Sequence, residues 1–319
     1  MKFALNKLNK TNMNKLVIVG VLFLLMAVLS VLSREFLTIT NINNVLRQTA
    51  SIVIAGCAVT LLMISGNFDL SIGAILALCG TMSAIFVTKG IPLPVSIIIS
   101  IGIGFFIGFF NGFFVIILKV PSIIATLGTM YIARGIAWVI TGGNSIHLGL
   151  GKNFTLLGRG FIGPMPINII ITIIVFCVFL FIQNKTILGK YTYAIGGNRR
   201  TAFLSGINTN RIGITLYCLV GLFAGFSGCM MASRLGVGSA SIGTGFEFDV
   251  IVAVVLGGTS LEGGEGSVFG MLVGALIVGF IGNGLNLMGI HSFYQDVVKG
   301  IVLVGAVLLD RMLKTRIKI

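Results

Sequence analysis

The side chains in this sequence that could do chemistry stand at interruptions of long apolar segments. Asp69 lies in the run Gly66-Asn67-Phe68-Asp69-Leu70-Ser71, and a second Phe-Asp pair, Phe248-Asp249, begins an apolar run near the other end of the chain. Asn-Gly pairs follow further along, at Asn111 and Asn283. Carboxylates and amides at broken helices can satisfy exposed backbone groups or contact a polar solute. These residue types indicate polar binding rather than covalent catalysis.

Motifs typical of catalysis or metal binding do not occur in the sequence. It has no Gly-x4-Gly-Lys-[Ser/Thr] loop for nucleotide phosphates, no Ser/His/Asp arrangement and no His-Glu-x-x-His motif. His147 and His291 lie at the predicted outer ends of apolar segments. The five cysteines lie within apolar segments without Cys-x-x-Cys spacing. We therefore predict that the chain is not an enzyme and itself binds no metal or cofactor.

The composition indicates the class of protein that must position these residues. Hydrophobic residues make up 56% of the 319 positions, charged residues 9%, and the mean hydropathy is +1.09. Soluble domains carry roughly 25% charged residues, and a soluble fold could not bury so much apolar surface. We predict an all-α polytopic membrane protein. The net charge of +14 comes mostly from Lys and Arg between the apolar segments, so topology explains it and no nucleic-acid partner is expected.

Membrane-length segments divide the whole chain. The ten predicted spans are 16–32, 45–65, 70–88, 94–118, 121–141, 166–183, 214–232, 248–261, 266–288 and 293–310. The eighth is short and the third is interrupted by glycine, so the count is about ten. They form one predicted transmembrane domain over residues 1–319, with halves of about 1–141 and 166–319.

The distribution of basic residues predicts the orientation. With both termini in the cytoplasm, fourteen Lys and Arg residues lie on the cytoplasmic side and six on the other. Six spans separate the amino terminus from the polar segment 184–213. Because six is an even number, this segment is also predicted to lie in the cytoplasm. Such a segment in an otherwise apolar chain is expected to meet a cytoplasmic partner.

The two Phe-Asp segments and the two Asn-Gly pairs are each separated by five spans. An odd separation predicts two inverted five-helix halves with interrupted helices, as in many transporters. We predict that the solute path is lined by Asn67, Asp69, Ser71, Asn111 and Asn283; the alternative is that these residues satisfy the broken backbone and neighbouring spans. Acidic residues cluster at span ends and breaks, which favours a neutral polar solute and an energy source outside this chain.

Two basic residues, Arg134 and Lys299, fall within predicted spans. We expect the Arg134 side chain to extend toward the outer surface or to meet a partner. Asp296 lies three residues before Lys299 on the same helical face, and the two are predicted to pair.

These motifs together resemble one family. The matching residues are Gly66-Asn67-Phe68-Asp69-Leu70-Ser71-Ile72-Gly73, Val120-Pro121-Ser122, Thr126-Leu127-Gly128-Thr129, Arg134-Gly135, Ala194-Ile195-Gly196-Gly197-Asn198, Leu204-Ser205-Gly206-Ile207, Asp249-Val250-Ile251, Gly257-Gly258-Thr259-Ser260-Leu261, Gly263-Gly264, Asn283-Gly284-Leu285-Asn286-Leu287 and Val298-Lys299-Gly300. The chain resembles permease subunits of bacterial ABC importers for ribose, other simple sugars and the related signal autoinducer-2.

The resemblance implies that the chain is a permease subunit importing a sugar or sugar-like solute across the bacterial inner membrane. Its implied partners are ABC ATP-binding subunits that carry ATP and Mg, a second permease chain (identical or a paralogue), an extracytoplasmic solute-binding protein and membrane lipid. Segment 184–213 then resembles the part that carries the coupling helix. The implied ATPase contacts are Gly197, Asn198, Arg199, Arg200, Ala202, Phe203, Leu204, Ser205 and Gly206.

One departure from the family pattern concerns this segment. Family members often continue with Glu-Ala-Ala after the asparagine, whereas this chain has Arg199-Arg200-Thr201. The two arginines are either additional cytoplasmic charges or an altered contact with a particular ATPase groove. Alternative functions are an ABC permease for branched-chain amino acids or nucleosides, an ion-coupled secondary transporter, and a passive channel or scaffold. The cytoplasmic segment and the lack of carboxylates in mid-span favour the ABC permease.

Overall fold

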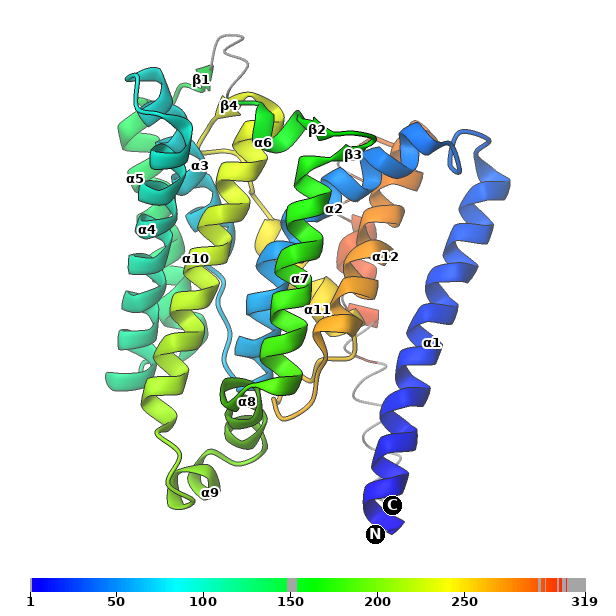
Figure 1. The fold of residues 1–319 in the computed structure, drawn as a ribbon, viewed down its shortest axis with the longest axis vertical. Coiled ribbons are helices and arrows are strands. Elements are labelled where there is room, and N and C mark those ends of the chain that lie inside the picture. Colours follow the sequence, from blue (N-terminus) through cyan, green and yellow to red (C-terminus); the bar gives the residue numbers. More distant parts are fainter. Residues whose placement is uncertain are drawn as a thin grey trace.

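The computed structural model of the chain is almost entirely helical (Figure 1). It describes residues 2–147 and 154–291 and, beyond these, residues 294, 295, 297–302, 304, 305 and 308. The long helices are α1 (Lys2–Leu32), α2 (Ile39–Ile64), α3 (Ile72–Thr88), α4 (Leu93–Gly112) with the π-helical turn η1 (Phe113–Ile117), α5 (Ser122–Thr141), α7 (Ile167–Lys185), α10 (Thr209–Leu235) and α12 (Val268–Leu287). The short helices are α6 (Leu156–Arg159), α8 (Ile187–Gly197), α9 (Arg199–Leu204) and α11 (Phe246–Leu256).

Two small antiparallel pairs of strands lie among these helices. Strand β1 (Ile146–His147) pairs with β4 (Val237–Gly238), with Ile146 opposite Gly238. Strand β2 (Phe161–Ile162) pairs with β3 (Met165–Pro166), with Phe161 opposite Pro166. Both pairs lie at the same end of the molecule as α6, opposite the end that holds α8 and α9 (Figure 1).

The predicted class of fold is confirmed. Within the described residues, six helices are long and apolar enough to cross a membrane, and Leu16–Leu32 and Ile72–Thr88 are shorter apolar helices. The eighth predicted span is represented only by α11, whose 11 residues measure about 16 Å along the axis. Because a membrane core is about 30 Å thick, α11 covers about half of it. The tenth predicted span lies partly outside the described residues.

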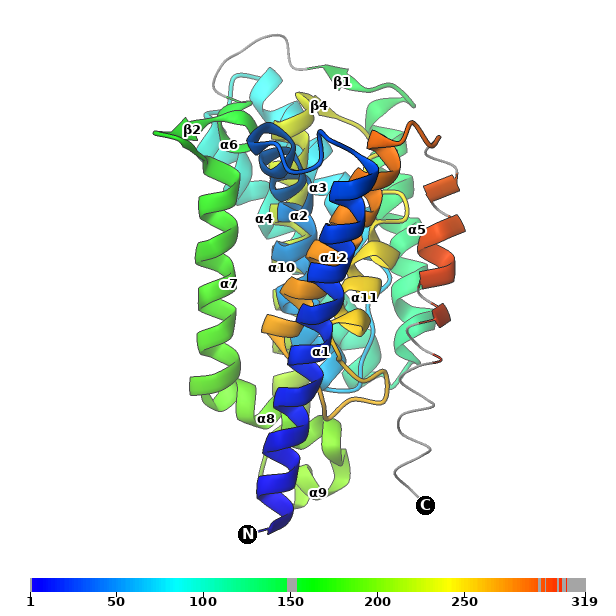
Figure 2. The ribbon, with the colours of Figure 1, turned by 90° about the vertical axis from the view of Figure 1, so that its right-hand side faces the viewer.

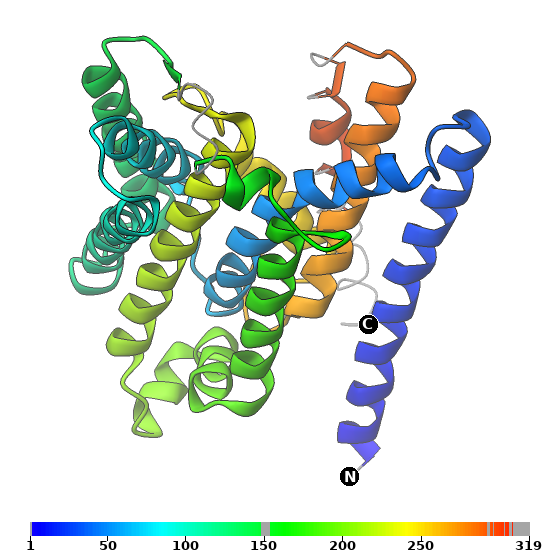
Figure 3. The same ribbon diagram turned by 45° about the horizontal axis from the view of Figure 1, so that its top comes forward.

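The amino terminus and segment 184–213 lie at the same end of the molecule, as the predicted topology requires. Helix α1 begins at the end of the molecule that carries α8 and α9, as Figures 1 and 2 both show. The amino-terminal lysines and the polar segment 184–213 therefore share one side. Helix α1 lies at one edge of the molecule and packs on α12 (Figure 3), where Leu22, Leu29, Val273 and Phe280 belong to one buried hydrophobic cluster.

Glycine lets the central helices approach closely. Helix α10 packs most extensively on α4, α3 and α2. A Cβ atom added to Gly108 of α4 would lie 3.1 Å from the Gly221 Cα of α10, and one added to Gly225 would lie 3.5 Å from the Gly104 Cα. A side chain at these points would push the two backbones apart. The glycines spaced by four in the sequence thus form the helix contact that small residues permit in membranes.

A substitution pair within α4 tests this contact. We expect Gly104→Val to weaken folding because its Cβ would collide with the Gly221 carbonyl oxygen, whereas a Cβ on Gly102 meets nothing within 4 Å. Overpacking costs about 1–3 kcal/mol. The melting temperature of the detergent-solubilised protein should fall clearly for Gly104→Val and little for the control Gly102→Val. Equal melting temperatures would contradict the close contact.

Candidate functional site

Three of the five predicted path residues meet in one buried cluster at the break between α2 and α3. The Asp69 Oδ1 atom accepts hydrogen bonds from the Ser71 backbone N–H at 2.8 Å and from the Ser71 hydroxyl at 2.6 Å. From α4, the Asn111 Nδ2 atom donates to Asp69 Oδ2 at 3.1 Å and to Ser71 Oγ at 2.8 Å. All three side chains are at most 1% exposed. The cluster therefore locks the interrupted chain to α4.

Other helices satisfy the backbone of the same break. The Tyr217 hydroxyl of α10 donates to the Phe68 carbonyl oxygen at 3.0 Å, and the Leu70 N–H donates to Thr126 Oγ1 of α5 at 3.1 Å. Side chains thus replace the helical hydrogen bonds that the break removes. These contacts favour the alternative reading of Asp69, Ser71 and Asn111, in which they support the broken backbone. Their place on a solute path stays a prediction.

The other two predicted path residues lie apart from this cluster. Asn67 donates to Ser65 Oγ at 3.0 Å. Asn283 of α12 forms a reciprocal amide pair with Asn41 of α2, with N···O distances of 2.8 and 2.9 Å. The two Asn-Gly pairs, at Asn111 and Asn283, therefore do not form equivalent contacts. The sequence analysis did not identify Asn41 as a partner of Asn283, because the two residues are 242 positions apart.

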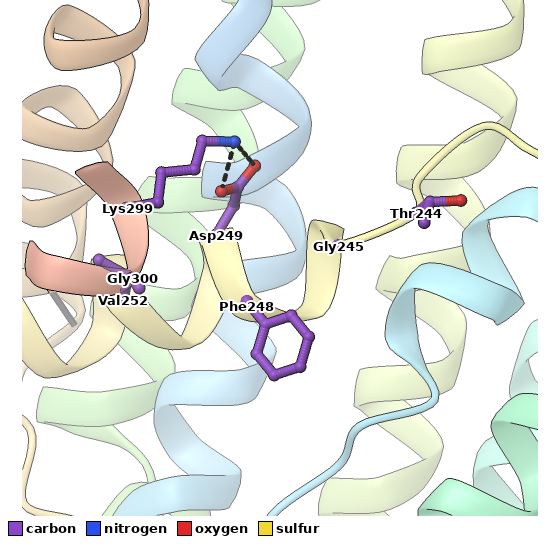
Figure 4. Close-up of a pocket in the computed structure, with 7 residues that line it drawn as sticks. All are labelled: Thr244, Gly245, Phe248, Asp249, Val252, Lys299 and Gly300. Atoms are coloured by element: carbon purple, nitrogen blue, oxygen red, sulfur yellow. Dashed lines mark hydrogen bonds and ion pairs between the residues drawn. The ribbon is translucent and has the colours of Figure 1, made fainter. Parts of the chain in front are cut away.

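A cavity beside α11 contains the polar groups that sequence reasoning did not assign to a site. It measures about 380 Å³ and is lined by Thr244, Gly245, Phe248, Asp249, Val252, Lys299 and Gly300 (Figure 4). We call it the α11 cavity. The Lys299 Nζ atom lies 2.9 Å from Asp249 Oδ1 and 3.1 Å from Asp249 Oδ2. The predicted partner of Lys299, Asp296, lies outside the described residues, and the partner observed here is on α11.

Arg134 of α5 meets a partner instead of extending to the outer surface. Its Nη1 atom donates to the carbonyl oxygens of Ala240 at 2.6 Å and Ile242 at 3.3 Å, and its Nη2 atom donates to Gly243 at 3.2 Å. These carbonyls belong to the irregular segment that precedes α11. A guanidinium group has five N–H donors in a fixed plane, so one side chain can hold several carbonyls. Arg134 thereby attaches α5 to the segment that leads into α11.

Glu247 is a second acidic residue on α11 that the sequence reading did not place in a site. Its side chain is 6% exposed, and its carboxylate lies against Gly73 of α3, where a Cβ atom would meet the Glu247 Cδ at 3.4 Å. Its Oε2 atom is buried without a hydrogen-bond partner among the described residues. Gly73 is thus needed for space, which explains a glycine that directly follows the start of α3.

The polar segment 184–213 forms two short helices at the end of the molecule. Asn198 begins α9, and its Oδ1 atom accepts a hydrogen bond from the Thr201 N–H at 2.9 Å. Gly206 ends the turn with a positive φ of 83°, which glycine adopts readily. Local capping residues therefore account for the short helix α9.

The predicted coupling residues fall into two groups by exposure. Phe203 and Leu204 are 65% and 76% exposed, whereas Ala202 is 4% exposed and packs inward. The other predicted residues on this surface are exposed or glycine: Gly197, Asn198, Arg199, Arg200, Ser205 and Gly206. Arg199 donates to Asn210 Oδ1 at 3.3 Å. We call the exposed group the α9 surface; it combines two arginines with two large apolar side chains.

Helix α8, which precedes α9, contacts the chain near both helix interruptions, after α2 and after α11. Its Gly196 makes this contact possible. At Gly196, a Cβ atom would lie 2.5 Å from the Gly264 backbone nitrogen and would collide with the Ile64 carbonyl oxygen. Gly264 N–H in turn donates to that oxygen at 2.8 Å. The end of α2, the end of α8 and the loop between α11 and α12 thus meet backbone to backbone.

A hydrogen-bond chain reinforces this junction. The Tyr193 hydroxyl of α8 donates to the Gly266 carbonyl oxygen at 2.7 Å and accepts from Gln183 Nε2 of α7 at 2.6 Å. Gln183 Oε1 accepts from the Val268 N–H that begins α12 at 3.1 Å. Burial raises the pKa of Tyr193, against the hydrogen bond from Gln183, so the phenol stays protonated. These bonds connect α8 to α7 and to the start of α12.

An almost entirely helical fold with membrane-length apolar helices, interrupted helices and an exposed helical turn at one end defines a polytopic membrane protein. A family model described as "branched-chain amino acid transport system / permease component" matches residues 41–307. The chain belongs to this family of ABC transporter permease subunits, which are not enzymes.

Individual relatives cover nearly the whole chain. The ribose import permease protein RbsC of Bacillus subtilis (strain 168) is 45% identical over 91% of this chain and 90% of that protein. The ribose import permease protein RbsC of Escherichia coli (strain K12) is 42% identical over 91% of each chain, and the D-allose transport system permease protein AlsC of the same strain is 35% identical over 92% of this chain and 90% of that protein. No solved structure matches the chain.

Two tyrosines of α8 provide a matched test of the junction. We expect Tyr193→Phe to lose the bonds to Gly266 and Gln183 and to destabilise the protein by about 1–3 kcal/mol, since two buried polar groups lose their partner. Amide hydrogen exchange should rise in the loop between α11 and α12. Tyr191→Phe, at an exposed position of the same helix, is the control. Unchanged exchange in both variants would show that the junction does not depend on the phenol.

Proposed function

We propose that this chain is a membrane-spanning permease subunit of an ABC importer for a sugar or sugar-like solute. The observation that carries this proposal is the similarity to permeases named for ribose and D-allose over more than nine-tenths of the chain. The exposed α9 surface supports it, because a transporter without a nucleotide-binding motif needs a place for an ATPase to dock.

Each end of the molecule has its own proposed partner. Two ATP-binding subunits, which carry ATP and Mg, dock on the α9 surface; an extracytoplasmic binding protein delivers the solute to the opposite end. A second permease chain, identical or paralogous, completes the path, and lipid surrounds the assembly. The protein lies in the bacterial inner membrane with both termini in the cytoplasm; the sequence supports this orientation, because it assigns fourteen basic residues to the predicted cytoplasmic side and six to the other.

The glycine junction suggests how ATPase movement reaches the path. Closure of the ATPase dimer displaces α9 together with α8. Because Gly196 contacts both Ile64 and Gly264 without an intervening side chain, the displacement acts directly on the breaks before α3 and after α11. The predicted path residues Asn67, Asp69, Ser71 and Asn111 move with the first break, and Asn283 moves with α12.

Uptake by the complete importer tests the function. Reconstituted with its ATPase and binding protein, the chain is expected to import labelled ribose only when ATP is present, with L-leucine and a nucleoside as comparison solutes. The proposal fails if the complete importer takes up L-leucine or the nucleoside but neither ribose nor D-allose, or if the purified chain alone carries a solute down an ion gradient.

Two variants test the α9 surface. We expect Ser205→Arg and Gly206→Pro to abolish uptake while membrane insertion is retained. Ser205 is exposed, so arginine alters the docking surface, and proline cannot adopt the φ of 83° at Gly206. Ser205→Ala, which removes only the bond to the Thr201 carbonyl oxygen, should keep most activity. Uptake at the unsubstituted rate in both Ser205→Arg and Gly206→Pro would disprove the docking role.

A further inference from the structure

Three arginines lie near one another at the end of the molecule that holds α6 and the strand pairs. Arg159 of α6 donates from Nε to the Arg234 carbonyl oxygen at 2.6 Å and from Nη2 to the Leu235 carbonyl oxygen at 2.9 Å. Further along the same segment, the centre of the Phe161 ring lies 4.4 Å from the Arg47 Cζ atom of α2. The segment from α6 to β2 therefore links α2 to the end of α10. We call Arg47, Arg159 and Arg234 the arginine cluster.

The positive charges of the arginine cluster are not balanced within the described residues. Arg47 and Arg234 are close enough for their charges to repel, and neither side chain forms an ion pair in the described part of the chain. The Arg47 Nε and Nη2 atoms are buried and have no hydrogen-bond partner there. A buried charge without a partner is costly, and guanidinium groups pair strongly with carboxylates and phosphates. The cluster therefore suits an anion.

An anion can approach the arginine cluster from outside the molecule. Arg159 is exposed, and Arg47 and Arg234 are partly exposed. The Phe161 ring that covers the Arg47 guanidinium is itself 55% exposed. The ring stabilises the cation through its face, and because it lies at the surface it has space to turn when an anion reaches Arg47.

Exposed apolar side chains lie beside the arginine cluster. On α6 and the β2–β3 hairpin, the large apolar side chains that are at least half exposed are Leu156, Phe161, Ile162 and Met165. Helix α7 begins directly after β3, and its exposed apolar side chains include Ile173, Ile174, Val178 and Phe181. A membrane-length helix with such a face contacts lipid. Figure 2 shows β2 projecting beyond α7 at one edge of the molecule, so the hairpin lies over the lipid that surrounds α7.

Arginines beside exposed apolar side chains at the end of a membrane helix fit a phospholipid. Apolar side chains enter the boundary between headgroups and acyl chains, while basic side chains attract anionic headgroups. One phosphate group has enough oxygen atoms to accept hydrogen bonds from two guanidinium groups. A soluble protein with an acidic surface would also satisfy the arginines, but it approaches from the aqueous side, whereas the hairpin projects sideways over lipid.

We propose that the arginine cluster binds the phosphate group of an anionic phospholipid in the outer leaflet, with Arg47 and Arg234 on the phosphate and the β2–β3 hairpin beside the acyl chains. The bound lipid then holds together the outer ends of α2 and α10, two helices that pack extensively on each other. The proposal uses the proposed orientation in the membrane, but it does not depend on which solute the permease carries.

Thermal melting of the purified full-length chain measures this binding. In detergent, phosphatidylglycerol should raise the melting temperature saturably and more than phosphatidylcholine with the same acyl chains, because a ligand of the folded state stabilises it. Arg47→Gln and Arg234→Gln should each weaken phosphatidylglycerol binding at least about fivefold. Arg34→Gln, which removes an exposed arginine between α1 and α2, is the matched control and should bind as the unsubstituted chain does. Melting in phosphatidylcholine alone shows whether each variant is folded.

A second measurement needs no variant. Phosphatidylglycerol with a photoreactive headgroup should label residues 156–166 of the unsubstituted chain, and labelling only elsewhere would overturn the proposal. So would equal binding of the two lipids, or unchanged phosphatidylglycerol binding in the folded arginine variants. Soluble glycerol 3-phosphate separates the sources of the phosphate: if it stabilises the chain as well as the lipid does, the site takes a free phosphate ester. If no lipid preference is found and Arg47→Gln weakens the complex with the binding protein, the partner is an acidic protein surface.

Discussion

Backbone polar groups at an interrupted helix have no water to bind within a membrane, and this constraint organises the centre of the molecule. At the break between α2 and α3, the carbonyl of Phe68 and the N–H of Leu70 are satisfied by Tyr217 and Thr126, which come from α10 and α5. Asp69 and Asn111 complete the arrangement. Because each lost helical bond needs a donor or acceptor from elsewhere, the break requires several helices to converge on it.

Several helices can meet at this break only if they pack closely, and glycine residues allow the close packing. Helices α4 and α10 touch at Gly108 and Gly221, so that α10 can bring Tyr217 to the break. The same property serves a second purpose at Gly196, where α8 contacts the backbone of Ile64 and Gly264. Contacts between backbones transmit displacement with little loss, because no flexible side chain lies between them. One residue type thus supports both the fold and its proposed movement.

The two interruptions have similar sequences and different environments. Asp69 is 1% exposed and bound to neutral groups, whereas the side chain of Asp249 is 20% exposed and paired with Lys299. The first break is therefore a buried structural element, and the second borders a cavity. The irregular backbone before α11 is held by the charged side chain of Arg134 instead of by neutral partners. An internal repeat predicted from the sequence need not repeat the role of its residues.

The sequence alone determined the class of protein, the approximate positions of the membrane helices, and the shared side of the amino terminus and segment 184–213. These properties depend on local hydropathy and charge, which neighbouring residues carry. Tertiary structure alone decided which side chains meet. Asn41 pairs with Asn283, and Lys299 with Asp249, across 242 and 50 residues. The sequence left two alternatives for Arg134, extension to the outer surface or a partner, and the carbonyl groups before α11 decided between them. The cavity beside α11 was likewise decided by the packing of distant helices, because only their contact brings Phe248 and Lys299 to a common surface.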